Sequence, residues 1–469
     1  MLAFAPVIAL VGRPNVGKST LFNRLTQSRA ALVSDFPGMT RDRQYGEALL
    51  DDQPFILIDT GGITDEKENI DQLVTEQSRL AIAEADVILF IVDARAHLTV
   101  ADLEIANILR LTQKNILVVV NKAEGMESEI ATADFFQLGF QHPPLAISAE
   151  HNGGITDLTD TIKALTPPEK MQQDALEKMS GIRLAIVGRP NVGKSTLTNR
   201  ILGEERVIVC DQPGTTRDSI FIPMKRLDQD YTLIDTAGVR RRGRVFEAIE
   251  KFSVVKTLQA IDAAQVVIFV MDAREGVTEQ DLRLLGFVIE NGKALVLAIN
   301  KWDGLTEDDK NKARASIDRR LDFIPYVRIH YISALHGSGV GNLFDSIQEA
   351  YKSANIKMTT PRLTRILEDA VTQHSPPLVQ GRRIKMRYAH PGGNFPPCII
   401  IHGNQLDALP DAYRRYLANT FQSKLKLVGT PVRIQFKYGD NPFGNRKNKL
   451  TPRQQHKKKR LMRHVKKKK

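Results

Sequence analysis

The sequence predicts an α/β protein made of two tandem, doubly wound domains, followed by a small α+β domain and a basic tail. Its length of 469 residues suggests about three domains at ~150 residues each. One eight-residue motif occurs at 12–19 and again at 188–195, an offset of 176 residues. Short apolar runs alternate with amphipathic stretches in both halves, which indicates mainly parallel sheets in a duplicated domain.

The apolar runs match between the two copies and have the length of buried strands. In the first copy they are Val7–Val11, Phe55–Ile58, Val87–Val92, Ile116–Val120 and Leu145–Ile147, and in the second Leu184–Val187, Thr232–Ile234, Val266–Met271 and Ala294–Ile299. We expect each run to be a central strand covered on both faces by helices.

Composition gives the domain boundaries. We expect a first domain at 1–167, a polar linker at 168–181, a second domain at 182–354, a third at 355–440 and a tail at 441–469. In the third domain the pattern predicts the order α-β-β-α-β, at Arg362–Gln373, Arg383–Tyr388, Pro397–His402, Asp411–Leu425 and Pro431–Tyr438. The tail lacks the apolar residues of a core, so we expect it to be disordered when free.

Cysteine content and hydropathy bear on the compartment. Cys210 and Cys398 are the two cysteines, far apart and without metal-ligand spacing, so a reducing compartment is expected. The N-terminus lacks a basic segment followed by a long apolar stretch, and no apolar run approaches the ~20 residues that span a bilayer. We therefore expect a cytoplasmic, monomeric protein with no membrane partner.

The net charge of +12 belongs to the tail. Residues 441–469 contain 13 Lys and Arg and no Asp or Glu, whereas the rest has 53 basic and 54 acidic residues. Such a tail indicates a phosphate-rich partner, with a merely solubilising role as the alternative. Its basic runs, Lys457–Arg460 and Lys466–Lys469, have no interleaved aromatics, which favours backbone attraction over base stacking.

The repeated motif G-x-x-x-x-G-K-S follows an apolar strand and precedes a helical pattern, the context of a phosphate-binding loop. Backbone amides would bind phosphate oxygens, Lys18 and Lys194 would reach the β- and γ-phosphates, and Ser19 and Ser195 would bind Mg²⁺. A glycine-rich turn with a surface lysine is the alternative, which a second copy makes negligible. The loop residues are Gly12, Arg13, Pro14, Asn15, Val16, Gly17, Lys18 and Ser19, and Gly188, Arg189, Pro190, Asn191, Val192, Gly193, Lys194 and Ser195.

A second motif, D-x-x-G, ends the next apolar strand in each copy. The aspartate would hold Mg²⁺ through water, and the last glycine amide would contact a γ-phosphate. Alone the motif is weak, but its position after the phosphate loop makes it specific. With the residue that follows, it comprises Asp59, Thr60, Gly61, Gly62 and Ile63, and Asp235, Thr236, Ala237, Gly238 and Val239.

A third motif predicts selection of guanine. A carboxylate at its fourth position can accept from guanine N1–H and the exocyclic amine, which adenine cannot offer. The members are Asn121, Lys122, Ala123 and Glu124, and Asn300, Lys301, Trp302 and Asp303, with Ser148-Ala149 and Ser333-Ala334 placed to offer an amide to guanine O6. Glu124 departs from the usual Asp by one methylene, and we still expect guanine binding there.

With these motifs and the P-G-x-T-R-D segments Pro37–Asp42 and Pro213–Asp218, the chain resembles the bacterial GTPase family with two P-loop GTPase domains, called Der or EngA, of the Era-like group. The resemblance implies GTP/GDP and Mg²⁺ binding, GTP hydrolysis, and a role in assembly of the large ribosomal subunit. It implies a KH-like third domain that packs against the GTPase domains. It also assigns Thr40 and Thr216 to the first switch, where they close on Mg²⁺ and the γ-phosphate.

Hydrolysis is expected to be slow. Ile63 and Val239 stand where Ras-like enzymes have a water-orienting glutamine. A cation or a partner would then assist. Asn15 and Asn191 stand where related GTPases bind K⁺, and bracing of the loop is an equally weighted alternative.

The regions after D-x-x-G differ in charge between the copies. The first is acidic (Asp65, Glu66, Glu68, Asp71), and the second is basic (Arg240, Arg241, Arg242, Arg244). They are either solvated loops or surfaces for different partners, with the arginines facing RNA. The third domain has no G-x-x-G, the loop with which KH domains clamp single strands. Packing is therefore its expected role, with RNA contacts possible through Arg382, Arg383, Lys385 and Arg387, which could equally form a solvated face.

The sequence thus predicts a GTP-hydrolysing switch that associates with the large ribosomal subunit and its RNA. A subunit of a tRNA-modification GTPase is one alternative, which the duplication and the lack of a C-terminal cysteine signature disfavour. An RNA-binding scaffold with vestigial nucleotide sites is the other.

Overall fold

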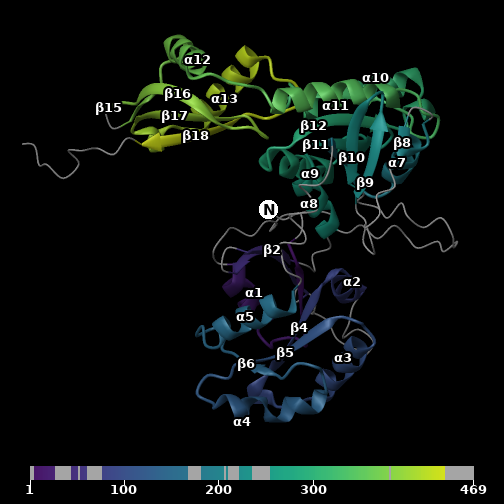
Figure 1. Ribbon diagram of the computed structural model, residues 1–469, viewed down its shortest axis with the longest axis vertical. Helices are drawn as coiled ribbons and strands as arrows, with labels where there is room; N and C mark the ends of the chain where they lie inside the picture. The colour runs from purple at the N-terminus through teal and green to yellow at the C-terminus, as the bar shows by residue number, and fades with distance from the viewer. Residues whose placement is uncertain are drawn as a thin grey trace, which may run out of the picture. The chain divides into compact units, whose positions relative to one another are not determined.

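The computed structural model describes residues 5–26, 44–50, 53–60, 76–166, 181–204, 207–209, 221–234, 254–379 and 382–438 (Figure 1). Both repeats fall in one compact unit, Met1–Ile356 with Asn394–Pro397 and Leu425–Val432, and the remaining C-terminal residues form a second unit. The predicted linker and the basic tail lie outside the described residues, so their boundaries stay predictions.

The first repeat forms a six-stranded sheet in the order β2-β3-β1-β4-β5-β6. Its strands are β1 (Val7–Val11), β2 (Gln44–Leu50), β3 (Gln53–Asp59), β4 (Val87–Asp93), β5 (Asn115–Asn121) and β6 (Leu145–Ala146). All neighbours are parallel except β2, which runs antiparallel to β3. The helices are α1 (Lys18–Thr26), α2 (Glu76–Glu84), α3 (Val100–Arg110), α4 (Ser128–Thr132) and α5 (Ile155–Leu165). The doubly wound prediction is confirmed.

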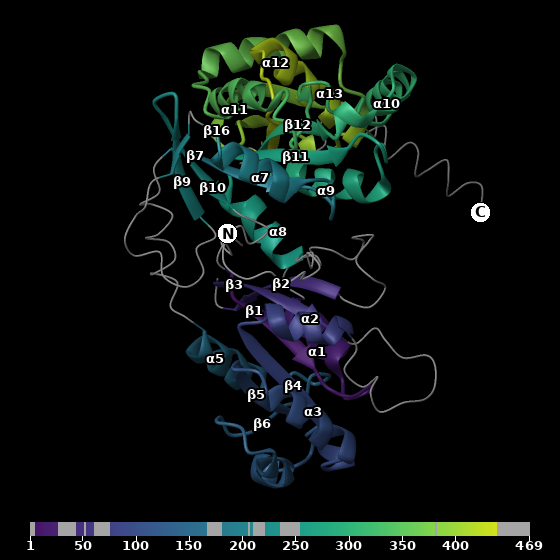
Figure 2. The same ribbon diagram turned by 90° about the vertical axis from the view of Figure 1, so that its right-hand side faces the viewer.

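Two hydrophobic clusters cover the two faces of this sheet. Leu21 of α1 and Leu158 of α5 pack with Ile8 on one face, and Ile105 of α3 packs with Ala9 on the other. Every residue of β4 is buried, which is why it reads as an unbroken apolar run. Two views show α1 and α5 on one side of the strands and α2 and α3 on the other (Figure 1, Figure 2).

The second repeat has seven strands in the order β13-β12-β11-β7-β10-β9-β8. They are β7 (Ile182–Val187), β8 (Val207–Val209), β9 (Phe221–Arg226), β10 (Gln229–Ile234), β11 (Val266–Asp272), β12 (Ala294–Asn300) and β13 (Arg328–Tyr331). The helices are α7 (Lys194–Leu202), α8 (Val254–Ala263), α9 (Glu279–Glu290), α10 (Glu307–Arg320) and α11 (Val340–Ala354). The β7, β10, β11 and β12 core matches the predicted runs.

The strands that the apolar runs did not predict lie toward the sides of the sheets. In β9, burial alternates, with Ile222, Met224 and Arg226 buried and their neighbours partly exposed. A strand covered on one face needs apolar residues only at every second position, so it leaves no continuous run. In β2 the buried Ala48 and Leu50 likewise alternate with the partly exposed Glu47 and Leu49.

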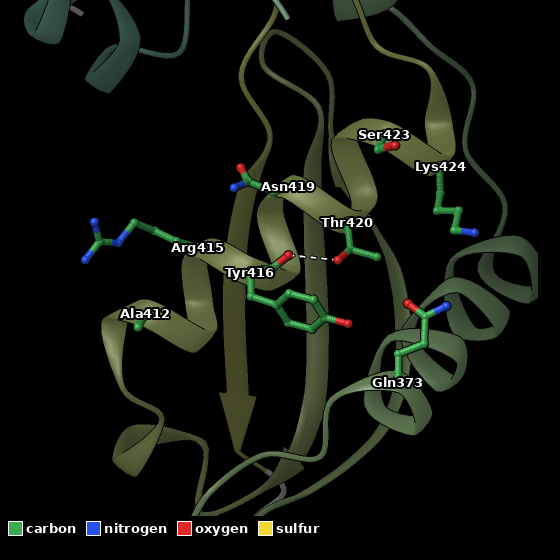
Figure 3. A pocket seen from close by; sticks show the side chains of 8 residues that line it. All are labelled: Gln373, Ala412, Arg415, Tyr416, Asn419, Thr420, Ser423 and Lys424. Atoms are coloured by element: carbon green, nitrogen blue, oxygen red, sulfur yellow. Dashed lines mark hydrogen bonds between the residues drawn. The ribbon is translucent and has the colours of Figure 1, made fainter. Parts of the chain in front are cut away.

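The C-terminal unit contains the predicted α-β-β-α-β elements, with two additional short strands that were not predicted between its first helix and its long strands. It comprises α12 (Thr360–Gln373), β14 (Leu378–Val379), β15 (Arg382–Arg383), β16 (Lys385–Gly393), β17 (Cys398–Asn404), α13 (Asp411–Leu425) and β18 (Arg433–Tyr438). β17 is central, antiparallel to β16 and parallel to β18. The Tyr416 hydroxyl of α13 donates to Ala370 O of α12 at 3.0 Å, beside a groove that both helices line (Figure 3).

Two short segments from the last quarter of the chain pack within the unit that holds both repeats. The Leu295 amide donates to Gly429 O at 2.5 Å, and the Gly429 amide donates to Tyr326 O at 2.7 Å. The ring of Phe395 lies 5.1 Å from that of Tyr351. These contacts join residues 394–397 and 425–432 to the second repeat. Within the described part of the chain, no helix is both long and apolar enough for a transmembrane span.

Candidate functional site

The loop between β1 and α1 is shaped by its glycines. Gly17 has φ +97°, and a Cβ there would lie 2.2 Å from Nδ2 of Asn121. A Cβ on Gly12 would lie 2.3 Å from Ile91 O. Neither position admits a larger residue, because the loop runs directly against the ends of β4 and β5.

The second repeat reproduces this packing. A Cβ on Gly188 would lie 2.3 Å from Val270 O, and one on Gly193 would lie 2.3 Å from Nδ2 of Asn300. Gly193 also has φ +97°. The two loops therefore have one geometry, and each leads into a helix N-terminus, where amides and the helix dipole favour phosphate.

The loop lysines are largely buried and turn back over their own loops. Lys18 Nζ donates to Gly12 O and Arg13 O, both at 2.8 Å, and Lys194 Nζ donates to Arg189 O at 2.7 Å. Burial lowers the pKa of Lys18, partly opposed by Asp59. An ammonium held in this way is positioned to exchange carbonyl contacts for phosphate oxygens.

Ser19 and Asp59 meet beside the first loop. The Ser19 hydroxyl donates to Asp59 Oδ2 at 2.7 Å, and Asp59 is 3% exposed at the end of β3. Thr60 follows and donates to Leu10 O at 2.7 Å, which fixes the strand end. A hydroxyl and a carboxylate oxygen are the ligand types that Mg²⁺ prefers, so the pair fits that ion. In the second repeat Ser195 is likewise the second residue of its helix, α7.

One asparagine in each repeat joins the phosphate loop to two other loops. Asn121 Nδ2 donates to Val16 O at 2.8 Å, and its Oδ1 accepts from the Ala149 amide at 3.0 Å. Asn300 makes the matching bonds, to Val192 O at 2.8 Å and from the Ala334 amide at 2.9 Å. The phosphate and base portions of each site are therefore tied through one side-chain amide.

The next residue, a lysine, bridges the loop to an aspartate that the sequence analysis missed. Lys122 Nζ donates to Asn15 O and to Asp93 Oδ2, each at 2.7 Å. Burial acts to raise the pKa of Asp93, but the bonds from Lys122 and the Arg95 amide, together with the charges of Lys122 and Arg13, outweigh it and the pKa is lowered.

The second repeat has the same bridge. Lys301 contacts Asn191 O at 2.8 Å and Asp272 Oδ2 at 2.6 Å. The signal was available, because Asp-Ala-Arg occurs at 93–95 and 272–274, with the same spacing that separates Asn121 from Asn300.

The two specificity carboxylates have different surroundings. Glu124 accepts from Ser148 Oγ at 2.9 Å and from the Arg95 guanidinium at 2.6 Å. Its own backbone amide, Ser148 and Arg95 lower its pKa. The first site thus holds its longer carboxylate with an arginine.

In the second site, Ser333 chiefly lowers the pKa of Asp303, with His336 Nε2 at 3.4 Å. Both carboxylates are ionised acceptors near neutral pH. Trp302 precedes Asp303 in the second motif, whereas Ala123 has the equivalent position in the first repeat. The Trp302 ring contacts that of Tyr331, tilted by 38° with 4.2 Å between the ring centroids, and the Arg314 guanidinium lies 5.3 Å from it.

The loop after β6 is held by an arginine from α1. Arg24 Nε donates to Ala149 O at 3.0 Å, and Arg200 of α7 contacts Ala334 O at 3.2 Å. The amides of Ser148 and Ala149 already donate, to Gly153 O at 2.9 Å and to Asn121. To accept from either amide, a guanine O6 would have to share it with its present acceptor or displace that acceptor.

The second residue of each phosphate loop pairs with a fully buried aspartate that caps a helix. Arg189 Nε lies 2.9 Å from Asp281 Oδ1, and Asp281 also accepts from the Thr278 amide at the start of α9. In the first repeat the Arg13–Asp102 distance is 3.5 Å. Glu275 adds a 2.8 Å contact to Arg189, so the second loop is braced more firmly.

Arg189→Ala is expected to lower the free energy of unfolding of the second repeat by about 2–3 kcal/mol, because it leaves the Asp281 charge buried with only its capping bonds. Urea denaturation monitored by circular dichroism would measure this. Arg319→Ala, on the exposed end of α10, is the control and should change stability by less than about 0.5 kcal/mol. Equal stability of the two variants would contradict the role given to the pair.

Besides the charged residues that follow each D-x-x-G motif, ten predicted nucleotide-site residues lie outside the described residues and keep their roles as predictions only. They are Thr40, Gly61, Gly62, Ile63, Thr216, Asp235, Thr236, Ala237, Gly238 and Val239.

Comparison with known families matches both repeats to one family model. The model described as "50S ribosome-binding GTPase" matches residues 7–122 and 183–301, and the KH-domain-like model of EngA bacterial GTPases matches 357–437.

The chain is 61% identical over 462 residues to GTPase Der of Hahella chejuensis, covering 98% of this chain and 97% of that protein. It is 58% identical over 463 residues to GTPase Der of Thioalkalivibrio sulfidiphilus, covering 99% and 100%. Among solved structures, that of Era with MgGDPNP and nucleotides 1506–1542 of 16S ribosomal RNA covers 55% of this chain and 93% of that one, at 24% identity and a TM-score of 0.29.

Proposed function

Because this chain belongs to the bacterial GTPase Der family, also called EngA, we propose that its two GTPase domains switch its association with the large ribosomal subunit during assembly of that subunit. The protein binds guanine nucleotide and hydrolyses GTP as a member of this family. The observation that carries the ribosomal part is the match of both repeats to a family model described as ribosome-binding.

Equivalent residues have the same proposed roles in the two GTP sites. The loop amides and Lys18 or Lys194 would bind the phosphates, and the buried asparagine would align the loop with the base. Glu124 or Asp303 would accept from the guanine N1–H and amine, and an adenine would leave that carboxylate without its donors. Asn15 and Asn191 either brace the loop or help bind K⁺ beside the phosphates.

Mg²⁺ would be held by Ser19 and Asp59, and by Ser195 and Asp235, with Thr40 and Thr216 closing on it in the GTP state. When bound, it would neutralise charge on the β- and γ-phosphate oxygens. The short Ser19–Asp59 contact supports this assignment in the first domain. Because Ile63 and Val239 follow the D-x-x-G motif, where Ras-like enzymes have a water-orienting glutamine, we propose slow hydrolysis that a partner or K⁺ accelerates.

Sedimentation with ribosomal subunits tests the proposal. Full-length protein is mixed with purified small and large subunits in GTP, GDP or no nucleotide, and the pelleted fraction is measured. We expect pelleting with large subunits, with a clear dependence on nucleotide. Equal pelleting in all three conditions would contradict the proposed nucleotide switch. No pelleting would contradict the proposed ribosomal partner. GTP turnover is also measured for the parent and, separately, for Lys18→Ala and Lys194→Ala. Turnover by the parent that falls in these variants excludes a scaffold without active sites.

Reversal of charge in the second switch region should weaken this association. Arg240, Arg241 and Arg242 follow the D-x-x-G motif, and changing all three to Glu is expected to reduce pelleting by about tenfold or more through lost phosphate contacts. Changing Asp65 and Glu66 to Lys in the first domain is the matched control. Unchanged co-sedimentation of the Arg240–Arg242 variant would assign these arginines to solvent.

A further inference from the structure

Three aromatic rings form a ladder on the sheet of the C-terminal unit. Tyr388 of β16 is in register with His402 of β17, and their rings are nearly parallel, 7° apart in plane and 4.5 Å between centroids. His390, two residues along β16, stacks 5.1 Å from His402. Tyr388 is 41% exposed, so its ring is accessible to a ligand.

This ladder is on the face of the sheet opposite the core. Ala389, Ile399 and Ile401 alternate with the ladder positions and are fully buried. Phe436 of β18 is in register with Ile401, and Arg414 of α13 lies over its ring at 5.1 Å. The helix therefore covers the face of Ile401, and the rings stand on the other face.

Hydrogen bonds fix the two histidine rings. His390 Nδ1 is 2.9 Å from Pro391 O, which can only accept, so Nδ1 carries the proton and Nε2 is an acceptor. His402 Nε2 then donates to it at 3.0 Å. Burial, His390 and Lys437 all lower the pKa of His402, which keeps it neutral at physiological pH. The ladder is therefore a set of aromatic rings held in fixed orientations.

Cations surround the rings. Lys385 pairs with Asn404, Lys437 with His402 and Arg433 with Cys398, which places all three basic side chains on the ladder face, and all three are exposed. β16, β17 and β18 contain no Asp or Glu. Stacking faces beside positive charge match single-stranded nucleic acid, in which bases and phosphates alternate.

We propose that this ladder face is a binding site for single-stranded RNA, with an unpaired base stacked on Tyr388 and flanking phosphates on Lys385, Arg433 and Lys437. The site deepens the proposed function, since it names the RNA-contacting surface of a ribosome-associated GTPase. It replaces the missing G-x-x-G loop as a means of holding a single strand.

Two other occupants fit the chemistry less well. The basic tail of the same chain would be repelled by the lysines and arginine of this face. The groove between α12 and α13 is lined by Arg415 and Lys424 (Figure 3). The Tyr416 hydroxyl in this groove donates to Ala370 O, and its ring contacts that of His374 edge to face. The Tyr416 side chain therefore joins the two helices to each other.

Binding of fluorescent oligouridylate to the full-length protein, measured by anisotropy, tests the site. A second probe of equal length and charge lacks the bases, so it reports attraction of phosphates alone, including attraction to the tail. Tyr388→Ala should weaken oligouridylate binding by about tenfold, the value of one stacked base. The same substitution should leave the affinity for the abasic probe unchanged. Tyr388→Phe keeps the ring and should bind both probes as the parent does.

Tyr416→Phe, which keeps the ring of the groove, is a second control and should not change either affinity. Equal affinities of Tyr388→Ala and the parent for oligouridylate would overturn the site, as would an equal loss for both probes. An acidic peptide that binds more tightly than RNA would also overturn it, in favour of a protein partner. Unaltered GTP turnover shows that the variants are folded. If the parent pellets with large subunits while Tyr388→Ala binds RNA normally, only the site fails and the proposed function stands.

Discussion

Gly193→Ala is expected to reduce nucleotide affinity at the second site by about a hundredfold while the first site binds normally. The new Cβ would lie 2.3 Å from Asn300 Nδ2, and φ +97° is unfavourable for alanine, together a strain of about 3 kcal/mol. Relief would require Asn300 to move, which breaks its bond to Val192 O. Equilibrium dialysis with labelled GDP should then give one tightly bound nucleotide per chain instead of two.

Gly286→Ala is the matched control, since a Cβ at that position in α9 meets nothing within 4 Å. It should bind two nucleotides with the parent's affinities. Gly17→Ala is the mirror variant and should silence only the first site, because its Cβ would meet Asn121 in the same way. Two tight sites in Gly193→Ala would show that the loop tolerates a side chain and that the inferred strain is wrong.

Asp303→Asn should exchange guanine for xanthine at the second site. The carboxylate accepts from two guanine donors, whereas an amide would oppose its own N–H groups to the guanine amine. We expect GTP affinity at that site to fall about a thousandfold. Xanthosine triphosphate, whose C2 carbonyl accepts from the amide, should recover most of the loss. Competition of each triphosphate against a fluorescent analogue gives the ratio.

Asp308→Asn serves as the control, because Asp308 is an exposed residue in the first turn of α10. It should keep the parent's preference. If Asp303→Asn also retains a guanine preference, the base is selected by other groups, and Asp303 supports the loop through Ser333 instead.

The sequence was sufficient for the parts of the fold and site that are local in the chain. Each phosphate loop is contiguous, and its glycines, lysine and serine appear in order between a strand and a helix. The central strands were predictable because burial on both faces makes them apolar throughout, as in Val87–Val92. The helix bounds of the C-terminal unit were also close, with α13 at Asp411–Leu425 as predicted.

The contacts between loops could not be predicted, because they depend on strand order. Asp93 meets Lys122 only because β4 and β5 are neighbours, with Asp93 in register with Asn121. The Arg95–Glu124 contact follows from the same register. The repeated Asp-Ala-Arg marks Asp93 and Arg95 as residues of the duplicated site, but it does not say which side chains they contact. The Arg189–Asp281 pair joins a loop to a helix cap 92 residues away, a separation at which sequence patterns carry no distance information.

Trp302 gives the protein an optical consequence. It is the one tryptophan of the 469 residues, and it lies inside the guanine motif of the second domain, in contact with the ring of Tyr331 and next to Asp303. Intrinsic emission excited at the tryptophan band therefore originates at one of the two sites. A nucleotide titration followed in this way reads occupancy of the second domain alone, without a label, while the first domain remains spectroscopically dark.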